Sequence, residues 1–569
     1  MNVVDFLSKF LHSQGVTHVF ELSGGMITQI IDALYREGII NIVSVKHEQA
    51  AGFAAEGYAR EKNIPGVALA TSGPGATNLL TAIGSCYFDA VPTIFITGQV
   101  NIHELKKEKE IRQLGFQETD IVSMAKAICK KVYQLEKGTD IVKILEEAFE
   151  IALSGRMGPV LIDIPMNVQR EYAIDNYNFQ KIEIKTQQNE LTESFWLDLN
   201  DKLQNAKKPI ILVGRGVLKE KVLLKSFIEQ TQIPVVTSLL AVDAIATNHH
   251  LKVGMIGSYG NRWANKAIGN ADFLLVLGSR LDIRQTGADV AGFANNKTIY
   301  QVDVDRNEIN NRVKDTFEIH ASVNGFLNQA IKYIDKVDVL DWIQIIENDR
   351  IKYPDTAEIK NVIGINPNVF MRKLSMHSLL AKSYTVDVGS HQMWAAQSLV
   401  LQEYQTFHTS GGMGAMGFSL PAAIGVALVS NKPVVSISGD GGFQLNLQEL
   451  QTIVYYNIPL KIVIINNESL GMIRQFQDSY FEGRHQSTVW GYSAPDFQKI
   501  ALAYGIDALT IDREEEIETA LQKMWLKPDQ PFLLQVMIDK NTNVYPKIAF
   551  GKPITEMEPD ALPIQIEST

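Results

Sequence analysis

The sequence of 569 residues has little cysteine, no excess of cations and no long apolar run. Its two cysteines, Cys86 and Cys129, belong to no CxxC pair and no Cys/His cluster, which fits a reducing compartment. The net charge of −11, without any basic run, argues against a nucleic-acid partner. Apolar stretches such as FLLVLG are far shorter than the roughly 20 residues of a membrane helix, and no signal or transit peptide is evident. We therefore expect a cytoplasmic protein with no membrane partner.

The chain is too long to fold around a single hydrophobic core, and we expect three domains. Short β-branched runs alternate with longer helical patterns almost throughout, which is typical of parallel sheets covered by helices. We therefore predict an α/β protein of three doubly wound parallel-sheet domains. Polar stretches at 170–191 and 347–367 read as linkers, so we expect domains at 1–170, 190–347 and 366–540, followed by a Pro- and acid-rich tail over 541–569 on the surface.

Residues 67–98 and 434–467 resemble each other. Each stretch contains a strand, a Gly-rich turn, a helix, an aromatic residue followed by a proline break, and a second strand. This pattern favours one architecture used twice around a different middle domain, although two ordinary strand-helix-strand units would read the same way.

Asp440 ends one predicted strand, and Asn467 ends the next strand along the chain. Ligands of doubly wound sheets bind outside the carboxyl ends of the strands, so this carboxylate and this amide oxygen should face one crevice. The pair suits Mg²⁺, which takes one or two protein oxygens together with phosphate oxygens. Gly439, Gly441 and Gly442 would let the backbone approach a diphosphate, whereas the simpler interpretation is a helix-capping aspartate in an ordinary turn.

The GDG stretch followed by NN resembles the thiamine-diphosphate motif of the acetolactate synthase and pyruvate oxidase superfamily. The resemblance extends over nearly the whole chain. It implies that the three domains bind, in order, the pyrimidine of thiamine diphosphate, FAD, and the diphosphate. It also implies that Asp440, Asn467 and the main-chain oxygen of Ser469 hold Mg²⁺, with Gly471 and Met472 beside the cofactor.

Thiamine chemistry needs an acid that places a proton on the cofactor's aminopyrimidine. Glu48 opens a helix that is apolar around most of its circumference and is therefore expected to be buried. By itself, such a glutamate is more simply explained as a favourable charge at a helix N-terminus. The stretch HEQAA resembles the family's HE-x-x-A element, which implies that Glu48 activates the pyrimidine. In this family the first and last domains meet across subunits, which implies a homodimer or homotetramer.

Two further stretches resemble elements of the family that contact the cofactor. In SGGMGAMGF the resemblance implies that Gly414 packs closely and that Met416 wedges beneath thiamine and bends it, although most methionines are simply core residues. In VDVGSHQ it implies that four residues lie near the diphosphate, namely Gly389, Ser390, His391 and Gln392. His391 is equally well explained as a hydrogen-bonded structural histidine.

Other stretches resemble acetohydroxyacid synthases in particular. LSGGM implies that Gly24 and Gly25 form a turn over the reacting centre. GFQETD implies that Phe116 and Gln117 lie at the substrate pocket, where Gln117 joins the catalytic residues. AICKK implies that Lys130 lines the entrance to the site.

The central stretch GSRLDIRQTG resembles the flavin region of FAD-containing synthases. It implies FAD contacts for Arg280 and Arg284, and an acceptor carboxylate bound by Arg284, to which a guanidinium fork is well suited. A surface salt bridge between Arg284 and Asp282 is the alternative. Gly214 and Gly216 in VGRGV would let the backbone approach FAD.

Phe476 stands where typical biosynthetic synthases have tryptophan, so the sequence does not decide which acceptor substrate the enzyme uses. One function is a carboligase that decarboxylates pyruvate and transfers the acetyl unit to a second pyruvate, giving acetolactate, or to a nucleotide-linked keto-sugar as in yersiniose-type enzymes. Another is an FAD-dependent pyruvate oxidase. A third is a non-catalytic binding or regulatory relative, against which the complete set of Glu48, Asp440, Asn467 and Met416 argues. The presence of a regulatory subunit is also left open by the sequence.

Overall fold

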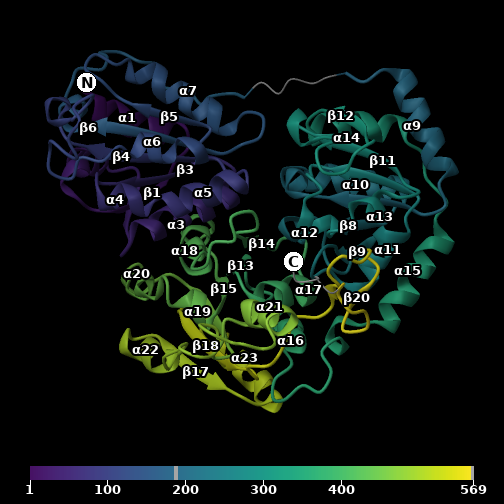
Figure 1. The fold of residues 1–569 in the computed structure, drawn as a ribbon. Helices are drawn as coiled ribbons and strands as arrows, with labels where there is room; N and C mark the ends of the chain where they lie inside the picture. Colours follow the sequence, from purple (N-terminus) through teal and green to yellow (C-terminus); the bar gives the residue numbers. More distant parts are fainter. Residues whose placement is uncertain (185–189, 565–569) are drawn as a thin grey trace.

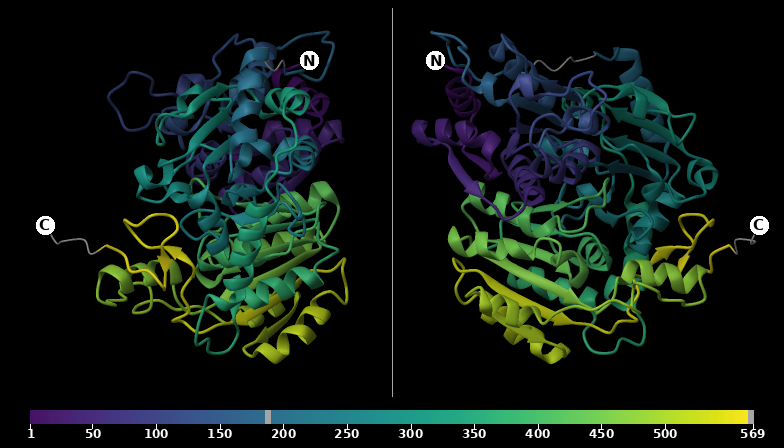
Figure 2. Two further views of the ribbon diagram at one scale, coloured as in Figure 1. Left: turned by 90° about the vertical axis from the view of Figure 1, so that its right-hand side faces the viewer. Right: turned by 60° about the vertical axis from the view of Figure 1, so that its left-hand side comes forward.

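The computed structural model describes residues 1–184 and 190–564, which form three domains, each built on one six-stranded parallel sheet (Figure 1). The first domain (purple to blue) and the middle domain (teal) lie side by side, and the last domain (green to yellow) lies below both (Figure 2). The predicted fold class is therefore confirmed. No helix within these described residues combines the length and the apolar character needed to cross a bilayer.

The sheet of the first domain has the strand order β2-β1-β3-β4-β6-β5. Its strands are β1 (His18–Leu22), β2 (Asn41–Ser44), β3 (Gly66–Ala70), β4 (Thr93–Gln99), β5 (Lys131–Gln134) and β6 (Pro159–Pro165). Its helices are α1 (Val3–Ser13), α2 (Thr28–Glu37), α3 (Glu48–Lys62), α4 (Pro74–Asn78), α5 (Leu80–Phe88), α6 (Ile121–Ala125), α7 (Ile141–Leu153) and α8 (Met166–Gln169). Strands β3, β4 and β6 are buried along their whole length, which explains their nearly continuous apolar sequences.

The sheet of the last domain has the order β14-β13-β15-β16-β18-β17. Its strands are β13 (Ser383–Val386), β14 (Thr406–Thr409), β15 (Val434–Gly439), β16 (Leu460–Asn466), β17 (Asp507–Ile511) and β18 (Phe532–Met537). Its helices are α16 (Pro367–His377), α17 (Ser390–Ser398), α18 (Ser419–Ser430), α19 (Asp440–Phe443), α20 (Leu450–Tyr455), α21 (Gly471–Tyr480), α22 (Phe497–Ala503) and α23 (Ile517–Met524). Counted from the start of each domain, the strand order equals that of the first domain, which confirms the predicted reuse of one architecture.

The middle domain is built differently, with the order β12-β11-β10-β7-β8-β9. Its strands are β7 (Pro209–Val213), β8 (Val235–Thr237), β9 (Lys252–Met255), β10 (Phe273–Leu277), β11 (Thr298–Asp303) and β12 (Phe317–His320). Its helices are α9 (Glu193–Asn205), the 3₁₀ helix η4 (Arg215–Glu220), α10 (Lys221–Thr231), α11 (Arg262–Asn270), α12 (Ile283–Thr286), α13 (Val290–Ala294), α14 (Val323–Tyr333) and α15 (Leu340–Lys352). Read from the β9 edge, this is the 3-2-1-4-5-6 order of dinucleotide-binding sheets.

Helices α3 and α18 dock the first domain on the last domain, and they approach so closely that only glycine fits at the contact. A Cβ added at Gly57 would lie 2.2 Å from the carbonyl oxygen of Ala422, and one added at Gly425 would lie 2.0 Å from that of Ala54. This contact explains why α3 is buried on nearly every side, as its sequence predicts.

The polar stretch after residue 170 reads as a linker, yet its described part packs on the first domain. The rings of Tyr177 and Phe179 lie 5.1 and 5.4 Å from the ring of Phe6. The first domain's core therefore extends beyond the boundary expected at residue 170. Residues 185–189 of this stretch lie outside the described residues.

The C-terminal tail does not lie over the surface, and that expectation is wrong. Ile548, Ile554 and Met557 are buried in the core of the middle domain. The tail folds back as an antiparallel pair of short strands, β19 (Lys547–Ile548) and β20 (Met557–Glu558), and Arg262 donates to the carbonyl oxygens of Met557 and Glu558. The few apolar residues of the tail and these two carbonyls determine its position. The acid- and proline-rich composition of the tail does not predict this packing. Residues 565–569 of the tail lie outside the described residues.

Candidate active site

We refer to the space at the carboxyl ends of β1 and β3 in the first domain as the first crevice. The chain leaves these neighbouring strands in opposite directions, which is where ligands of doubly wound sheets bind. A Cβ added at Gly24 would lie 2.5 Å from the Thr71 Cβ, so the turn after β1 has to be glycine to pack on the turn after β3. Met26, further along the same turn, donates its backbone N–H to the Thr71 hydroxyl at 3.3 Å. Gly25 has open space around it.

Glu48 faces this crevice from the first residue of α3. The helix begins there because the His47 ring accepts the backbone N–H of Gln49 at 3.1 Å. The Glu48 carboxyl is 7% exposed, and its Oε2 accepts a hydrogen bond from the Asn78 side chain at 2.9 Å. Its Oε1 accepts none within the described residues and lies 3.3 Å from where a Cβ at Gly75 would stand. One carboxyl oxygen is thus fixed by Asn78.

Gln117 joins this crevice through a second turn. Both Gln117 and Gly73 have left-handed backbone, with φ of +65° and +70°, and a Cβ at Gly73 would lie 3.2 Å from the Gln117 Cβ. The turn is held from behind by Gln99, which donates to the Thr119 carbonyl at 2.8 Å. Phe116 is 79% exposed, so within one chain it has almost no packing partner.

Lys130 lies apart from this group. Its ammonium donates to the backbone carbonyls of Ile151 and Ser154 at the end of α7, where a positive charge complements the helix dipole. Burial lowers the pKa of Lys130 to about 8. The structure therefore gives Lys130 a helix-capping contact, and its place at a substrate entrance stays a prediction.

We refer to the space at the carboxyl ends of β15 and β16 in the last domain as the second crevice, where three oxygens converge. Strands β15 and β16 are parallel neighbours, so Asp440 and Asn467 follow adjacent strand ends as predicted. The Asn467 side-chain oxygen lies 2.7 Å from the Ser469 carbonyl oxygen and 3.2 Å from Asp440 Oδ1, and every one of these atoms is an acceptor. Turning the amide would supply an N–H to both neighbours, but a cation would satisfy all three oxygens as they stand.

The surroundings of Asp440 suit a charged ligand. Burial raises the pKa of its carboxyl to about 6, because little water reaches it. Its Oδ2 accepts a hydrogen bond from the Tyr492 hydroxyl at 2.9 Å. Within the part of the chain that the structure describes, no three His, Cys, Asp or Glu side chains gather as a metal site, so a cation here would rely on one carboxylate, one amide and one carbonyl. This donor set fits Mg²⁺.

His391 lies against the same crevice and is not a fully satisfied structural histidine. Its Nε2 is buried without a hydrogen-bond partner in the described residues. Its ring is so close to Gly439 that a Cβ there would lie 2.9 Å from Nδ1, while a Cβ at Gly389 would lie 2.7 Å from Cε1. Burial lowers the pKa of His391 to about 3, so the ring is neutral and can donate one hydrogen bond.

The neighbours of His391 separate into two groups. Ser390 faces the crevice, since its hydroxyl lies 2.8 Å from where a Cβ at Gly471 would stand. Gln392 faces away, because its amide donates to the Thr409 hydroxyl at 2.6 Å and holds β14. The VDVGSHQ stretch therefore brings three of its four predicted residues to the crevice and uses the fourth to support the sheet.

Met416 reaches the crevice from the turn before α18. Its Cε lies 3.5 Å from where a Cβ at Gly441 would stand. Gly414 in the same turn has a φ of +68°, a backbone conformation that favours glycine. Asp387 fixes the turn by accepting the backbone N–H of Gly417 at 2.9 Å, although burial raises the pKa of this carboxyl to about 7. A Cβ at Gly442 would lie 2.7 Å from Asp387 Oδ2.

Helix α21 begins at Gly471, two residues after Ser469, and contains Met472 and Phe476. Met472 is partly buried against the core of the last domain. Phe476 is 51% exposed, and its ring lies 4.7 Å from the ring of Tyr480. The predicted substrate-wall residue therefore stands on an open aromatic surface.

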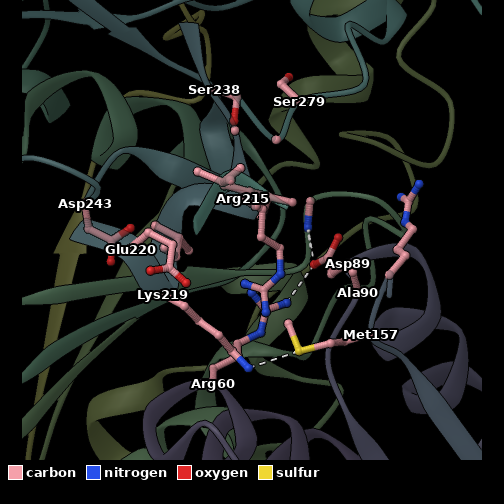
Figure 3. A pocket seen from close by; sticks show the side chains of 18 of the residues that line it. Arg60, Asp89, Ala90, Met157, Arg215, Lys219, Glu220, Ser238, Asp243 and Ser279 are labelled. Carbon is pink, nitrogen blue, oxygen red and sulfur yellow. Dashed lines mark hydrogen bonds and ion pairs between the residues drawn. The ribbon is translucent and has the colours of Figure 1, made fainter. Parts of the chain in front are cut away.

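The middle domain contributes a cavity of about 1100 Å³ that it shares with both other domains (Figure 3). Gly214 and Gly216 line this cavity, but close packing on a neighbouring turn already explains why both residues are glycine. A Cβ at Gly214 would lie 2.3 Å from the Gly278 carbonyl oxygen, and one at Gly216 would lie 2.8 Å from the Gly278 Cα. The two glycines let the turns after β7 and β10 pack together.

Arg280 and Arg284 also line this cavity. Arg280 pairs with Asp282 at 3.1 Å, while Asp282 accepts the backbone N–H of Arg284 at 2.9 Å and begins α12. The Arg284 guanidinium is exposed and forms no ion pair with a described residue, so the surface salt bridge considered for it is wrong.

The two crevices belong to different domains of the chain. No hydrogen bond or ion pair among the described residues joins Glu48 to the three converging oxygens. They are connected indirectly, because the Asn446 side chain donates to Gln49 at 3.1 Å and to the Gly417 carbonyl at 2.8 Å. One chain therefore presents the acid and the oxygen cluster as two half-sites.

Sequence reasoning missed four residues that support these half-sites, namely Thr71, Asn78, Asp387 and Tyr492. Thr71 and Asn78 lie within the TSGPGATN turn, whose position after a buried strand is a usable signal. Asp387 follows β13 in the same way. Tyr492 has no such signal, because it reaches Asp440 from a distant loop.

Three family descriptions match the chain. "Thiamine pyrophosphate enzyme, N-terminal TPP binding domain" matches residues 1–124, the central domain of the same enzymes matches residues 198–330, and their C-terminal TPP binding domain matches residues 387–536. The "Acetolactate synthase large subunit" of Lactococcus lactis is 36% identical over 96% of this chain and 94% of its own length. The "Acetolactate synthase isozyme 2 large subunit" of Escherichia coli is 35% identical over 98% of this chain and 99% of its own length. The chloroplastic "Acetolactate synthase 2" of Nicotiana tabacum is 36% identical over 96% of this chain and 83% of its own length.

Proposed function

The chain belongs to the thiamine pyrophosphate enzymes of the acetolactate synthase type, and from this premise we propose how its two half-sites act on pyruvate. It is a carboligase that depends on thiamine diphosphate. When bound, thiamine diphosphate would supply a carbon nucleophile for the keto carbon of pyruvate and a sink for the electron pair that departing CO₂ leaves. The reaction proposed is the joining of two pyruvates to acetolactate with release of CO₂.

Each half-site has a distinct task in this proposal. Glu48 holds a proton at Oε1 and exchanges it with the cofactor's aminopyrimidine, while Asn78 keeps its other oxygen fixed. Asp440, Asn467 and the Ser469 carbonyl hold Mg²⁺ and, through it, the diphosphate. The convergence of these three acceptor oxygens carries the proposal, because a cation would satisfy all three at once.

Further residues orient and enclose the substrate. Met416 would support the cofactor from beside Gly441, and Asp387 keeps the Met416 turn in place. His391 offers its free Nε2 toward the diphosphate. Gly24 packs on Thr71 and Gln117 packs on Gly73, and the substrate would lie beside these two turns.

We also propose a homodimer in which Glu48 of one copy meets Asp440 of the other. Variants Glu48→Gln and Asp440→Ala test this arrangement, because each alone damages every site. In randomly reassembled mixtures, half of the dimers are hybrids and each hybrid keeps one intact site, so roughly a quarter of wild-type activity should return. If mixing restores nothing, each site is built within one chain.

We propose FAD as the ligand of the middle cavity, with Arg280, Arg284 and the turn of Gly214 and Gly216 beside it. A dinucleotide-type strand order and the cavity volume support this assignment. The ultraviolet-visible spectrum of the purified protein tests for flavin. Pyruvate added without oxygen then distinguishes an oxidase, whose flavin bleaches rapidly, from the proposed carboligase, whose flavin stays yellow.

A nucleotide-linked keto-sugar is the second candidate acceptor. Phe476 favours it, since a half-exposed aromatic surface can accommodate a larger acceptor than a keto acid. Incubating the protein with pyruvate, Mg²⁺, thiamine diphosphate and a panel of keto acids and nucleotide keto-sugars, with products identified by mass, decides between them. Absence of CO₂ release from pyruvate alone and with every acceptor would refute the carboligase.

Two properties of the whole protein belong to the same proposal. Two relatives are named large subunits, which implies a smaller partner chain for those proteins. The activity of the isolated chain shows whether this one works alone. The free, buried cysteines Cys86 and Cys129 support a reducing, cytoplasmic location, which fractionation of cells tests directly.

A further inference from the structure

Three charged side chains of the first domain are buried together where this domain contacts the last one. The Arg60 side chain, in the last turn of α3, is 1% exposed, and the two acids that pair with it, Glu56 and Asp89, are fully buried. The Arg60 guanidinium lies 2.7 Å from Asp89 Oδ2 (Figure 3). Burying charges costs free energy that an ion pair alone often fails to recover, so the other groups that this cluster binds are informative.

Asp89 also binds the glycine-rich turn that carries Met416. Its Oδ2 accepts the backbone N–H of Gly411 at 3.0 Å, and its Oδ1 accepts that of Gly412 at 2.7 Å. The contact is close, because a Cβ at Gly412 would lie 2.9 Å from Asp89 Oδ1. One carboxylate is therefore shared between an arginine of the first domain and two successive N–H groups of the last domain.

Neighbours of Asp89 and Arg60 hold the same turn. The Ser85 and Ser410 hydroxyls lie 3.1 Å apart, and the Ser410 hydroxyl accepts the backbone N–H of Ala415 at 3.2 Å. The Arg60 guanidinium also lies 5.5 Å from the centre of the Phe418 ring, at the end of the turn. The first domain thus contacts this turn on both sides of Met416.

The composition of the turn explains why such support matters. Four of the seven residues from 411 to 417 are glycine, and Gly414 and Gly417 have φ of +68° and +83°. Fixing the backbone of one residue costs about 1–2 kcal/mol, and glycine loses the most freedom. A ligand that had to order the turn itself would lose this free energy from its binding, whereas a turn that Asp89 and Asp387 already hold is ordered beforehand.

We propose that Asp89, oriented by Arg60, is a positioning residue for the thiamine diphosphate half-site of its own chain, because it orders the turn that places Met416 beside the cofactor. The inference rests on the proposed role of Met416. Since Glu48 is the first residue of α3 and Arg60 lies in its last turn, this one helix would contribute to both sites of the proposed homodimer.

Calorimetric titration of the full-length protein with thiamine diphosphate and with inorganic pyrophosphate, both in the presence of Mg²⁺, tests the proposal. Pyrophosphate carries the anion for the Asp440 half-site but lacks the rings that Met416 would contact. Asp89→Asn replaces one acceptor oxygen by an NH₂ group that cannot accept an N–H. It should weaken thiamine diphosphate binding by about ten- to a hundredfold, which is the loss expected for a charged hydrogen bond. The affinity for pyrophosphate should not change.

A double-variant cycle with Met416→Ala shows whether Asp89 acts through Met416. The loss of thiamine diphosphate affinity in the Asp89→Asn/Met416→Ala protein should be close to that of the more affected single variant. Losses that add would show that Asp89 acts independently of Met416 and would contradict the proposal.

Asp272→Asn is the matched control. The two oxygens of Asp272 accept the backbone N–H groups of Lys207 and Lys208 at 2.8 and 2.9 Å, which is the same kind of contact in the middle domain. This variant should have a lower melting temperature and unchanged affinity for both ligands. If Asp89→Asn does not fold, Arg60→Lys replaces it. The lysine keeps the charge but loses the fork that reaches both acids, so a smaller loss with the same preference between the two ligands is expected.

Two results would overturn this inference alone. One is unchanged affinity for thiamine diphosphate in the Asp89 and Arg60 variants. The other is an equal loss for thiamine diphosphate and pyrophosphate, which would show that the cluster only stabilises the contact between the domains. Failure of the wild-type protein to bind thiamine diphosphate would refute the proposed function as well.

Discussion

Replacing Glu48 by glutamine separates the chemical task of this residue from its structural one. The change leaves the shape of the side chain intact and converts one carboxyl oxygen to an NH₂ group. The hydrogen bond from Asn78 to Glu48 Oε2, at 2.9 Å, can be kept by the glutamine oxygen. The NH₂ group then occupies the place of Oε1, which has no hydrogen-bond partner among the described residues. The expected change in the free energy of unfolding is below about 1 kcal/mol.

The effect on activity should be far larger. A glutamine cannot release and recover a proton near neutral pH, so the contribution of acid-base catalysis disappears. We expect CO₂ release from pyruvate to fall by about 10²- to 10⁴-fold. Affinity for thiamine diphosphate should stay near that of the wild type, because the proposed diphosphate site is the Asp440 half-site.

Three measurements on the same preparations test this separation: initial rates of CO₂ release, calorimetric titration with thiamine diphosphate in the presence of Mg²⁺, and thermal unfolding. Glu37→Gln is the matched control, since it makes the same chemical change at the end of α2, away from both crevices. Near-normal turnover in Glu48→Gln would remove the residue from the mechanism. A loss of folding as large as the loss of activity would show that its role is structural.

Asp440→Ala should weaken Mg²⁺-dependent binding of thiamine diphosphate while leaving the fold intact, as measured by titration with and without EDTA, and unchanged affinity would count against a ligand role. Gly425→Ala should destabilise the protein by about 2–3 kcal/mol, because the added methyl would overlap the Ala54 carbonyl at the contact of α3 and α18. A Cβ there would lie 2.0 Å from the carbonyl oxygen. An unchanged melting temperature would contradict this prediction. Burial raises the pKa of Asp387 to about 7 from an ordinary value of 3.8, so folding favours its protonated form. The stability that it contributes is complete below about pH 4 and is lost as the pH rises through 7, by about 4 kcal/mol in total. Asp387→Asn keeps an oxygen for the Gly417 N–H and should therefore flatten the fall in melting temperature between pH 4 and 8 in the cofactor-free protein, whereas an equally steep fall would contradict the assignment.

The buried central strands could be read from the sequence because their side chains are apolar on both faces. The runs at β3, β4, β15 and β16 were each found where the alternation of strand and helix predicts them. Short edge strands escaped this reading. β5 and β17 have partly exposed, polar residues, and their pairing partners rather than their own residues make them strands.

The two half-sites could likewise be predicted from the sequence only in part. The approach of Asp440 to Asn467 follows from the sequence, because adjacent parallel strands bring their carboxyl ends to one edge. The roles of Lys130 and Asp387 do not, since each depends on which backbone groups another segment brings into reach. The residue type determines which groups a side chain can bind. The fold determines which of those groups lie within its reach.

By itself, the sequence determined the class of the fold, the reuse of one architecture, and the carboxylate and amide at two neighbouring strand ends, because these depend on local pattern and on the geometry common to all parallel sheets. Only the tertiary structure decided that α3 packs on α18 and that the tail completes the core of the middle domain. These features arise from contacts between segments hundreds of residues apart, and the energy of such a contact depends on the shape and charge of both sides at once.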